Sequence, residues 1–230
     1  MSAKEEILKS LAETAAADLY NNKYVNRTGM VDGVRVSELV AEFLLDNLHM
    51  LSNIQQITRE KDGRSYKTPN REEKKEEVRH ENSKRNEEWT AKDLYHAEIE
   101  GLGKILDYQT PLKNERKDRA GKVDMLSFDK ASNTVYLLEL KAPNSDETLL
   151  RCVLEIFTYG EIVDTEKLLA DFSTPEMDLT NTEVKKAVLV YESCKAYADF
   201  DTCQNARKLM EKLGVAFFVL AADNTKANKR

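Results

Sequence analysis

Three residues on two predicted neighbouring strands, Asp124, Glu139 and Lys141, have the types and the spacing that could perform chemistry. Apolar residues predict strands over residues 122–128 and 134–141, and the polar stretch between them predicts a tight turn. Alternate side chains of a strand share a face, so Glu139 and Lys141 point to the same side. Carboxylate oxygens bind hard divalent cations, and a neighbouring ammonium can hold a water molecule or stabilise negative charge.

The register of the two strands decides whether the carboxylates meet. If residues 130–133 form the turn, Asp129 faces Thr134, and the same register places Asp124 directly opposite Glu139. Directly opposed side chains have Cβ atoms about 4.5–5.5 Å apart, and like charges at that distance are destabilising. We therefore expect a cation between Asp124 and Glu139, and Mg²⁺ or Mn²⁺ is the kind of ion that such a pair binds.

A third carboxylate is predicted on the preceding helix. Residues 87–108 have the apolar spacing of a helix, and Glu98 falls inside the apolar arc that contains Leu94, Leu102 and Ile105. A charge on a buried stripe needs a partner, because burying it alone is costly. The same cation would be that partner, so Glu98 is a third candidate ligand.

The elements that position these residues extend from residue 89 to residue 221. After the first helix, the sequence predicts strand, strand, strand, helix, strand, helix and strand, at residues 108–113, 122–128, 134–141, 146–170, 186–191, 198–213 and 215–221. This order predicts an α/β layer structure. Its first strands form a meander, and its later strands are joined by helical crossovers.

The first 58 residues are predicted to form a mainly helical region. Apolar spacing indicates helices over residues 2–20 and 37–54, and glycines between them favour a short hairpin within residues 23–36. Residues 59–88 are dominated by alternating charges, with Val78 as their only aliphatic residue, and such a stretch cannot bury a face. We expect a solvated helix or a linker there, followed by one domain over residues 89–230.

The motif G-K-V-D at residues 121–124, followed by E-L-K at residues 139–141, resembles the PD-(D/E)XK nuclease superfamily. Val123 stands where that family usually has proline. The predicted order of elements over residues 89–221 is similar to the restriction-endonuclease-like αβββαβ core, in which helices flank a mixed central sheet. The resemblance covers a little over half of the chain and leaves the N-terminal region unexplained.

The resemblance also implies roles for individual residues. Asp124, Glu139 and the carbonyl of Leu140 are expected to bind the metal ion. Lys141 is expected to orient and activate the attacking water molecule, and Glu98 to assist with the metal or the water.

One helix motif resembles the recombination-exonuclease branch of the same family, which has Q-x-x-x-Y. This chain has Glu155 and Tyr159 at that spacing, with glutamate in place of glutamine, and Arg151 lies one turn earlier on the same face. These residues are candidate accessory residues of the site. The alternative is that they form an ordinary mixed helix flank.

The loop before the strand of Asp124 carries an excess of positive charge. Its basic residues are Lys113, Arg116, Lys117, Arg119 and Lys122. We expect them to contact nucleic-acid phosphates, which would allow an acidic protein to handle a polyanion. The alternative is a solvated loop without a ligand.

The composition limits the remaining classes of function. The chain has 230 residues with 35 Lys/Arg and 41 Asp/Glu, a net charge of −6, which argues mildly against a protein that coats nucleic acid. No apolar run approaches the roughly 20 residues of a membrane span. The three cysteines form no C-x-x-C pair, so neither a disulfide framework nor a four-cysteine metal site is expected. A cytoplasmic location follows from these features as an expectation.

These observations favour a nuclease that uses Mg²⁺ or Mn²⁺ to hydrolyse phosphodiester bonds, with DNA as the preferred substrate. A catalytically silent nuclease-fold protein is the alternative, acting as a binding or assembly subunit of a defence or repair system. The N-terminal helices are candidates for homodimer formation or for docking of a partner.

Overall fold

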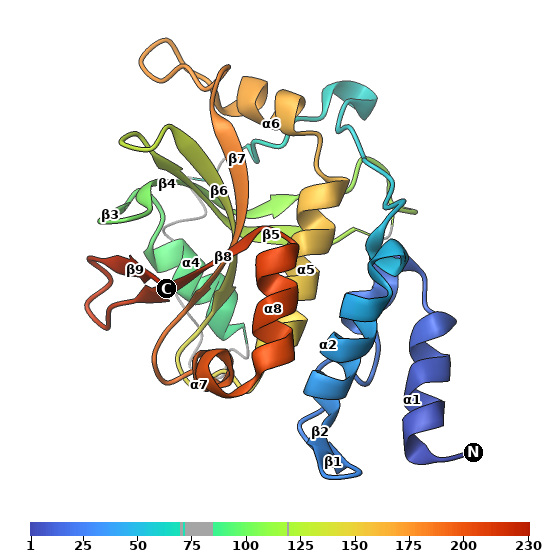
Figure 1. Cartoon of the computed structure of the whole chain (residues 1–230). Coiled ribbons are helices and arrows are strands. Elements are labelled where there is room, and N and C mark those ends of the chain that lie inside the picture. Colours follow the sequence, from blue (N-terminus) through green and yellow to red (C-terminus); the bar gives the residue numbers. More distant parts are fainter. Residues whose placement is uncertain (70, 72–84, 119) are drawn as a thin grey trace.

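The computed structural model describes residues 1–69, 71, 85–118 and 120–230 (Figure 1). At its centre is a seven-stranded mixed sheet with the strand order β3-β4-β5-β6-β7-β8-β9. The strands are β3 Glu98–Ile99, β4 Gly103–Pro111, β5 Lys122–Asp129, β6 Thr134–Lys141, β7 Glu183–Val190, β8 Val215–Leu220 and β9 Ala227–Lys229. The helices are α1 Ala3–Ala12, α2 Val36–Asp46, α4 Asn86–Asp93, α5 Leu149–Ile162, α6 Thr165–Phe172, α7 Lys195–Thr202 and α8 Gln204–Lys212.

The sheet combines an antiparallel and a parallel part. β4, β5 and β6 form an antiparallel meander, whereas β6, β7 and β8 run parallel. α5 and α6 connect β6 to β7, and α7 and α8 connect β7 to β8. The predicted mixed α/β structure, with a meander followed by helical crossovers, is therefore confirmed.

Helices cover both faces of this sheet. α5 packs on β6 and β7, and α8 packs on β8, whereas α4 packs against β4, β5 and β6 from the other face (Figure 1). Every residue of β6 is buried, because this strand is central and has a helix on each side. Glu139 and Lys141 lie in this buried strand, so their charges must find partners within the fold.

The predicted register of β5 and β6 is confirmed. Met125 pairs with Leu138 in the antiparallel ladder. One further step along the same register places Asp124 opposite Glu139, at the end of the sheet where β6 ends.

The helix predicted over residues 87–108 is wrong in its second half. α4 ends at Asp93, and the chain continues into β3 and β4. Gly101 and Gly103 have φ values of +89° and +73°, which a right-handed helix does not accommodate. Glu98 consequently lies on the edge strand β3, where its side chain is exposed, and not on a buried helix face.

Two predicted helices are divided in two. Residues 146–170 form α5 and α6, and Asp164 between them caps α6 by accepting a hydrogen bond from the Lys167 N–H at 3.1 Å. Residues 198–213 form α7 and α8. The predicted N-terminal helices are likewise shorter, and each is followed by a 3-10 turn, η1 Ala16–Asn21 and η2 Leu48–Leu51.

The N-terminal region packs on the sheet domain. η1 contacts α5, and α2 contacts α8. Leu11, Leu44 and Leu154 belong to one continuous hydrophobic core that includes both regions. The predicted hairpin is present as β1 Met30–Val31 and β2 Val34–Arg35.

The described part of the predicted charged linker is not simply solvated. Tyr66 is fully buried, donates a hydrogen bond from its hydroxyl to the carbonyl of Ile57 at 2.7 Å, and accepts one from the Asp164 N–H at 3.0 Å. One aromatic side chain therefore anchors this polar segment to the core. Val78 lies outside the described residues.

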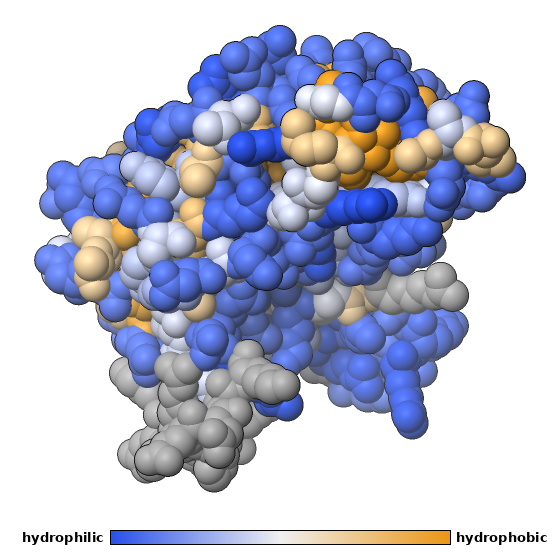
Figure 2. Space-filling view, turned by 90° about the horizontal axis from the view of Figure 1, so that it is seen from below, coloured by the Kyte–Doolittle hydropathy of each residue, from blue (hydrophilic) through white to orange (hydrophobic). Residues whose placement is uncertain are grey.

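The hydrophilic surface of the molecule is consistent with its high content of charged residues. In the view from below, most of the face is hydrophilic, and its largest apolar patch lies on the right, where Figure 1 places α1, α2 and the β1–β2 hairpin (Figure 2). The exposed large hydrophobic side chains among the described residues are Met1, Met30 and Val34. Across that same part of the chain, no helix combines the length and apolarity needed to span a membrane.

Candidate active site

Asp124 lies near the beginning of β5, and both of its carboxylate oxygens accept hydrogen bonds. Oδ2 accepts a hydrogen bond from the Leu140 N–H at 3.0 Å, and Oδ1 accepts one from Nε2 of Gln109 at 2.9 Å. The N–H and C=O of one strand residue point to the same neighbouring strand, so the Leu140 carbonyl also faces the side of Asp124. The predicted pair of Asp124 and the Leu140 backbone is therefore brought together.

Lys141 is the centre of the charged cluster. Its side chain is only 2% exposed, and Nζ lies 2.8 Å from Glu139, 2.9 Å from Glu147 and 3.2 Å from Glu87. The shared face of Glu139 and Lys141 was predicted, whereas the contributions of Glu87 and Glu147 were not. Four charged side chains from β6, α4 and the loop before α5 thus meet at one place.

Glu87, and not Glu98, is the acidic residue that the first helix contributes. Glu87 lies in the first turn of α4 and reaches Lys141 with its carboxylate. Glu98 lies opposite Lys104 in the register of β3 and β4 at the edge of the sheet. Its side chain is exposed to solvent, so its charge does not require a buried cation as a partner. The assignment of Glu98 to the site is therefore corrected.

The three candidate accessory residues on α5 form a connected row. Nη1 of Arg151 lies 2.6 Å from Oε2 of Glu155, and the Tyr159 hydroxyl donates to Oε1 of Glu155 at 2.9 Å. A Cβ atom at Gly121 would collide with the Tyr159 hydroxyl, so glycine allows this row to approach the loop before β5.

Three carboxylates of this region lie close enough together that they could hold a metal ion. Glu139, Glu147 and Glu155 each offer one oxygen, and these oxygens lie within 4.8 Å of one another. Oε2 of Glu147 is buried and forms an ion pair with Nζ of Lys141 at 2.9 Å, but it accepts no hydrogen bond from any described residue. An all-oxygen donor set is the kind that Mg²⁺ and Mn²⁺ prefer. Asp124, a predicted ligand, lies outside this compact group of three.

Burial and the repulsion between neighbouring carboxylates raise the pKa values of three acidic side chains of the site. Burial raises the pKa of Asp124 to about 7, with Glu87 adding to the rise and Lys141 opposing it. Burial, reinforced by the charge of Asp124, raises the pKa of Glu139 well above its usual value. Burial also raises the pKa of Glu87, against the attraction of Lys141.

Lys141 remains an ammonium despite its burial. Burial alone would lower the pKa of Lys141, but the surrounding acidic groups, with Glu139 as the largest contributor, outweigh it and raise the pKa well above its usual value. Lys141 can therefore donate hydrogen bonds and stabilise negative charge, and it is unsuited to accept a proton.

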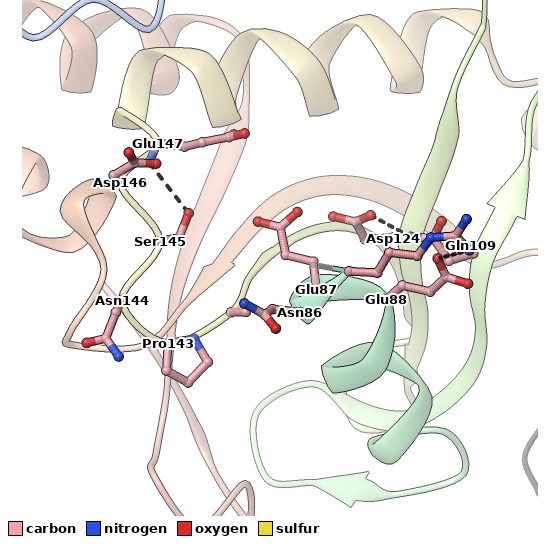
Figure 3. A pocket seen from close by; sticks show the side chains of 12 residues that line it. Asn86, Glu87, Glu88, Gln109, Asp124, Pro143, Asn144, Ser145, Asp146 and Glu147 are labelled. Carbon is pink, nitrogen blue, oxygen red and sulfur yellow. Dashed lines mark hydrogen bonds and ion pairs between the residues drawn. The ribbon is translucent and has the colours of Figure 1, made fainter. Parts of the chain in front are cut away.

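A cavity of about 550 Å³ opens beside the cluster. Figure 3 shows side chains from α4, β5 and the loop before α5 lining it together. Its acidic lining residues are Glu87, Glu88, Asp124, Asp146 and Glu147. The cavity is wide enough to admit part of a ligand and is strongly acidic, which favours cations within it.

The predicted basic loop lies apart from this cavity. Lys113, Arg116, Lys117 and Lys122 are exposed, and none of these four lines the cavity. Asn114 anchors the loop, because its side-chain oxygen accepts hydrogen bonds from two backbone N–H groups of residues 60 and 61 at 3.1 and 3.0 Å. Arg119 lies outside the described residues.

Comparisons of this chain with protein-family models, with curated proteins and with solved structures find no match. The candidate function therefore rests on the geometry and electrostatics of the site.

Proposed function

We propose that this protein is a metal-dependent nuclease of the PD-(D/E)XK type, which hydrolyses phosphodiester bonds, with DNA as the expected substrate. The observation that carries the proposal is the buried Lys141 ammonium in contact with Glu139 and Glu87. It lies at the sheet end where the register of β5 and β6, continued one step beyond the Met125–Leu138 pair, places Asp124 opposite Glu139. Burying a lysine among carboxylates beside an acidic cavity is unfavourable for folding stability. A role of these groups in hydrolysis at a metal site would explain the arrangement.

The metal ion would be held by Asp124, Glu139 and the Leu140 carbonyl. Glu147 and Glu155 lie close enough to Glu139 to serve as further ligands of the ion. A bound Mg²⁺ or Mn²⁺ supplies Lewis-acid chemistry, lowering the pKa of a water molecule and neutralising charge on the phosphate. The donor set contains no sulfur or imidazole, which supports these two ions over zinc.

The roles of the protein side chains follow from their protonation. Lys141, as an ammonium, would orient the attacking water and stabilise charge that develops on the phosphate oxygens. Glu87 lines the cavity and has a raised pKa, so its carboxylate is suited to accept the proton from that water. Glu87 would thus accept the proton, and Lys141 would stabilise the negative charge.

The order of elements supports the finer assignment of the fold. α4, then β4, β5 and β6, then α5 and β7 follow the sequence of a restriction-endonuclease-like αβββαβ core, and β8 extends the sheet. The motif residues Asp124, Glu139 and Lys141 lie at one end of β5 and β6, as that core requires.

Cleavage of single-stranded, double-stranded and circular DNA in Mg²⁺, Mn²⁺ or chelator tests the proposal. Wild type is compared with Glu139→Gln and Lys141→Met, which keep the side-chain volume of each site. Lys104→Met, an exposed change on the same sheet, is the matched control. Wild type and the control should cleave only with metal, and each site variant should be at least about 100-fold slower.

Two results would change the assignment. Metal-independent cleavage, or cleavage that survives Glu139→Gln and Lys141→Met, would remove this site from the reaction. Metal and DNA binding without cleavage of any substrate would favour the alternative, a silent binding or assembly subunit with a nuclease fold.

A further inference from the structure

The N-terminal region is attached to the start of α5 by hydrogen bonds. The Thr148 N–H donates to Oδ1 of Asn26 at 2.8 Å, and the Thr148 hydroxyl donates to the Val25 carbonyl at 3.0 Å. Thr148 is fully buried and is the N-cap of α5, where its hydroxyl oxygen also accepts from the Arg151 N–H at 3.2 Å. Residues 25 and 26 therefore hold the first turn of the helix that carries Arg151 and Glu155.

Tyr20, from the preceding η1 segment, contacts that helix directly. The guanidinium carbon of Arg151 lies 4.6 Å from the centre of the Tyr20 ring, within the range of a cation–π interaction. The ring of Tyr159 meets Tyr20 edge to face, with centroids 5.6 Å apart and planes at 73°. Tyr20 is 7% exposed, so the contact is buried and little screened.

Both partners of Tyr20 bind the same carboxylate. Arg151 engages Oε2 of Glu155, and the Tyr159 hydroxyl engages Oε1. A glutamate side chain has several rotatable bonds, and these two contacts restrict it to one orientation. In that orientation Glu155 lies with Glu139 and Glu147 in the group whose oxygens are within 4.8 Å of one another.

We propose that Tyr20 is a positioning residue of the active site. Its ring holds Arg151 and Tyr159, and through them it keeps Glu155 in the arrangement with Glu139 and Glu147 that suits a divalent cation. The inference rests on the metal site of the proposed function. It makes the N-terminal region a structural component of that site.

Tyr24 provides a matched control in the same region. It is 3% exposed, and its ring also faces cationic side chains, with Nζ of Lys23 4.7 Å and the guanidinium carbon of Arg27 5.8 Å from the centroid. Its hydroxyl, however, donates to Glu6 on α1 at 2.6 Å and not to a residue of the site. Tyr24→Leu therefore removes a similarly buried aromatic ring whose hydroxyl hydrogen bond goes to α1 and whose cationic neighbours are not residues of α5.

Calorimetric titration of the full chain with Mn²⁺ tests the proposal without DNA. The proteins are wild type, Tyr20→Phe, Tyr20→Leu and Tyr24→Leu, and each is also melted in chelator. Tyr20→Leu should weaken the Kd for Mn²⁺ by about 10-fold, the lower end of the range for loss of a residue that orients a ligand. Tyr20→Phe, which keeps the ring, should stay within about 2-fold of wild type.

The control separates positioning from general destabilisation. Tyr24→Leu should lower the Tm about as much as Tyr20→Leu and leave the Kd for Mn²⁺ unchanged. Equal Kd values for the two leucine variants would overturn the inference. If Tyr20→Leu does not fold, Tyr20→Met, which retains bulk without an aromatic face, decides the question by the same comparison.

The outcome for Tyr20 is distinguishable from the outcome for the nuclease. If wild type binds Mn²⁺ but cleaves no DNA, the nuclease proposal fails, while the comparison of Kd values still decides the role of Tyr20. If wild type binds no Mn²⁺, the site that Tyr20 would position does not exist, and the inference is rejected.

Discussion

Removing the charge of Asp124 should stabilise the metal-free protein at alkaline pH, although the residue is hydrogen-bonded in the fold. In Asp124→Asn the amide oxygen can still accept from the Leu140 N–H. The new amide group can donate to Gln109 once the side-chain amide of Gln109 is flipped, because Gln109 then presents its oxygen. The substitution therefore keeps the hydrogen bonds and removes mainly the charge.

The magnitude follows from the pKa of Asp124, which burial raises from 3.8 to about 7. An acid whose pKa is higher in the folded state binds its proton more tightly there than in the unfolded chain. Its contribution to stability is therefore present at low pH and is lost as the pH rises from about 4 to about 7. Linkage with these two values makes the advantage of Asn over Asp grow by about 2.5 kcal/mol between pH 5 and pH 8. For a chain of this size, that corresponds to a change of roughly 5–10 °C in the difference between the two Tm values.

Thermal melts in chelator at pH 5, 6, 7 and 8 provide the assay. Asp118→Asn is the control, because Asp118 likewise accepts two hydrogen bonds, in its case from the backbone N–H groups of Asn114 and Glu115 at 2.9 and 2.6 Å, but lies outside the site. The control should be less stable than wild type by about 1 kcal/mol at pH 8, whereas Asp124→Asn should be more stable.

Metal reverses the comparison for Asp124. Mn²⁺ at 100 times its Kd should stabilise wild type by about 2.7 kcal/mol and should stabilise Asp124→Asn much less. A stability difference between wild type and Asp124→Asn that does not vary with pH would refute the reasoning. So would a variant that is less stable than wild type at pH 8 in chelator, because Asp124 would then be an ordinary structural hydrogen-bond acceptor.

Two further predictions concern the corrected acid and the basic loop. Glu87→Gln should slow metal-dependent cleavage about 100-fold, as expected for loss of a proton acceptor, whereas Glu98→Gln should cleave like wild type; equal rates would return Glu87 to a structural role. Exchanging Lys113, Arg116 and Lys117 for Gln should weaken DNA binding equally for all sequences and reduce its salt slope by about 1 for each lost phosphate contact. The control is Lys208→Gln, an exposed change on α8, which should alter neither the affinity for DNA nor the salt slope. An unchanged salt slope in the triple variant would show that the loop has no role in DNA binding.

Local patterns predicted the strands that carry the site because their signals are unambiguous. The tight turn between β5 and β6 fixes the register, and a period of two then places Asp124 opposite Glu139. The buried second half of β7 and the largely buried β8 are likewise indicated by their continuous apolar runs. These parts of the fold depend on residues close together in the sequence.

The second half of the first helix shows where periodicity is ambiguous. Ile99, Leu102 and Ile105 fit a helical spacing, yet they occupy β3, a turn and β4. The signal that could have corrected the prediction was the pair Gly101 and Gly103, since glycines so closely spaced inside a proposed helix favour a turn. Helical periodicity without that signal places Glu98 on a buried face, which is why the prediction for Glu98 is wrong.

The partners of Lys141 could be predicted only in part. Glu139 shares its strand, so the alternation of side chains brings it to Lys141. Glu147 follows the strand in a loop, and Glu87 lies more than fifty positions upstream, so only tertiary packing brings them within 3.2 Å of Nζ. Tyr20 is predicted only as the last residue of the helix over residues 2–20, because its contact with Arg151 joins two regions that are far apart in the sequence.

The site contains more carboxylates than cationic side chains, and the repulsion among the carboxylates lowers the stability of the fold. Five carboxylates surround two cationic side chains, the carboxylates being Glu87, Asp124, Glu139, Glu147 and Glu155 and the cations Lys141 and Arg151. Burial raises the pKa of Asp124 and of Glu139, so protons neutralise part of the excess when no metal is bound. A bound divalent cation would supply that positive charge and displace the protons, so its affinity is expected to increase as the pH rises. The same repulsion between the carboxylates would therefore favour binding of the ion.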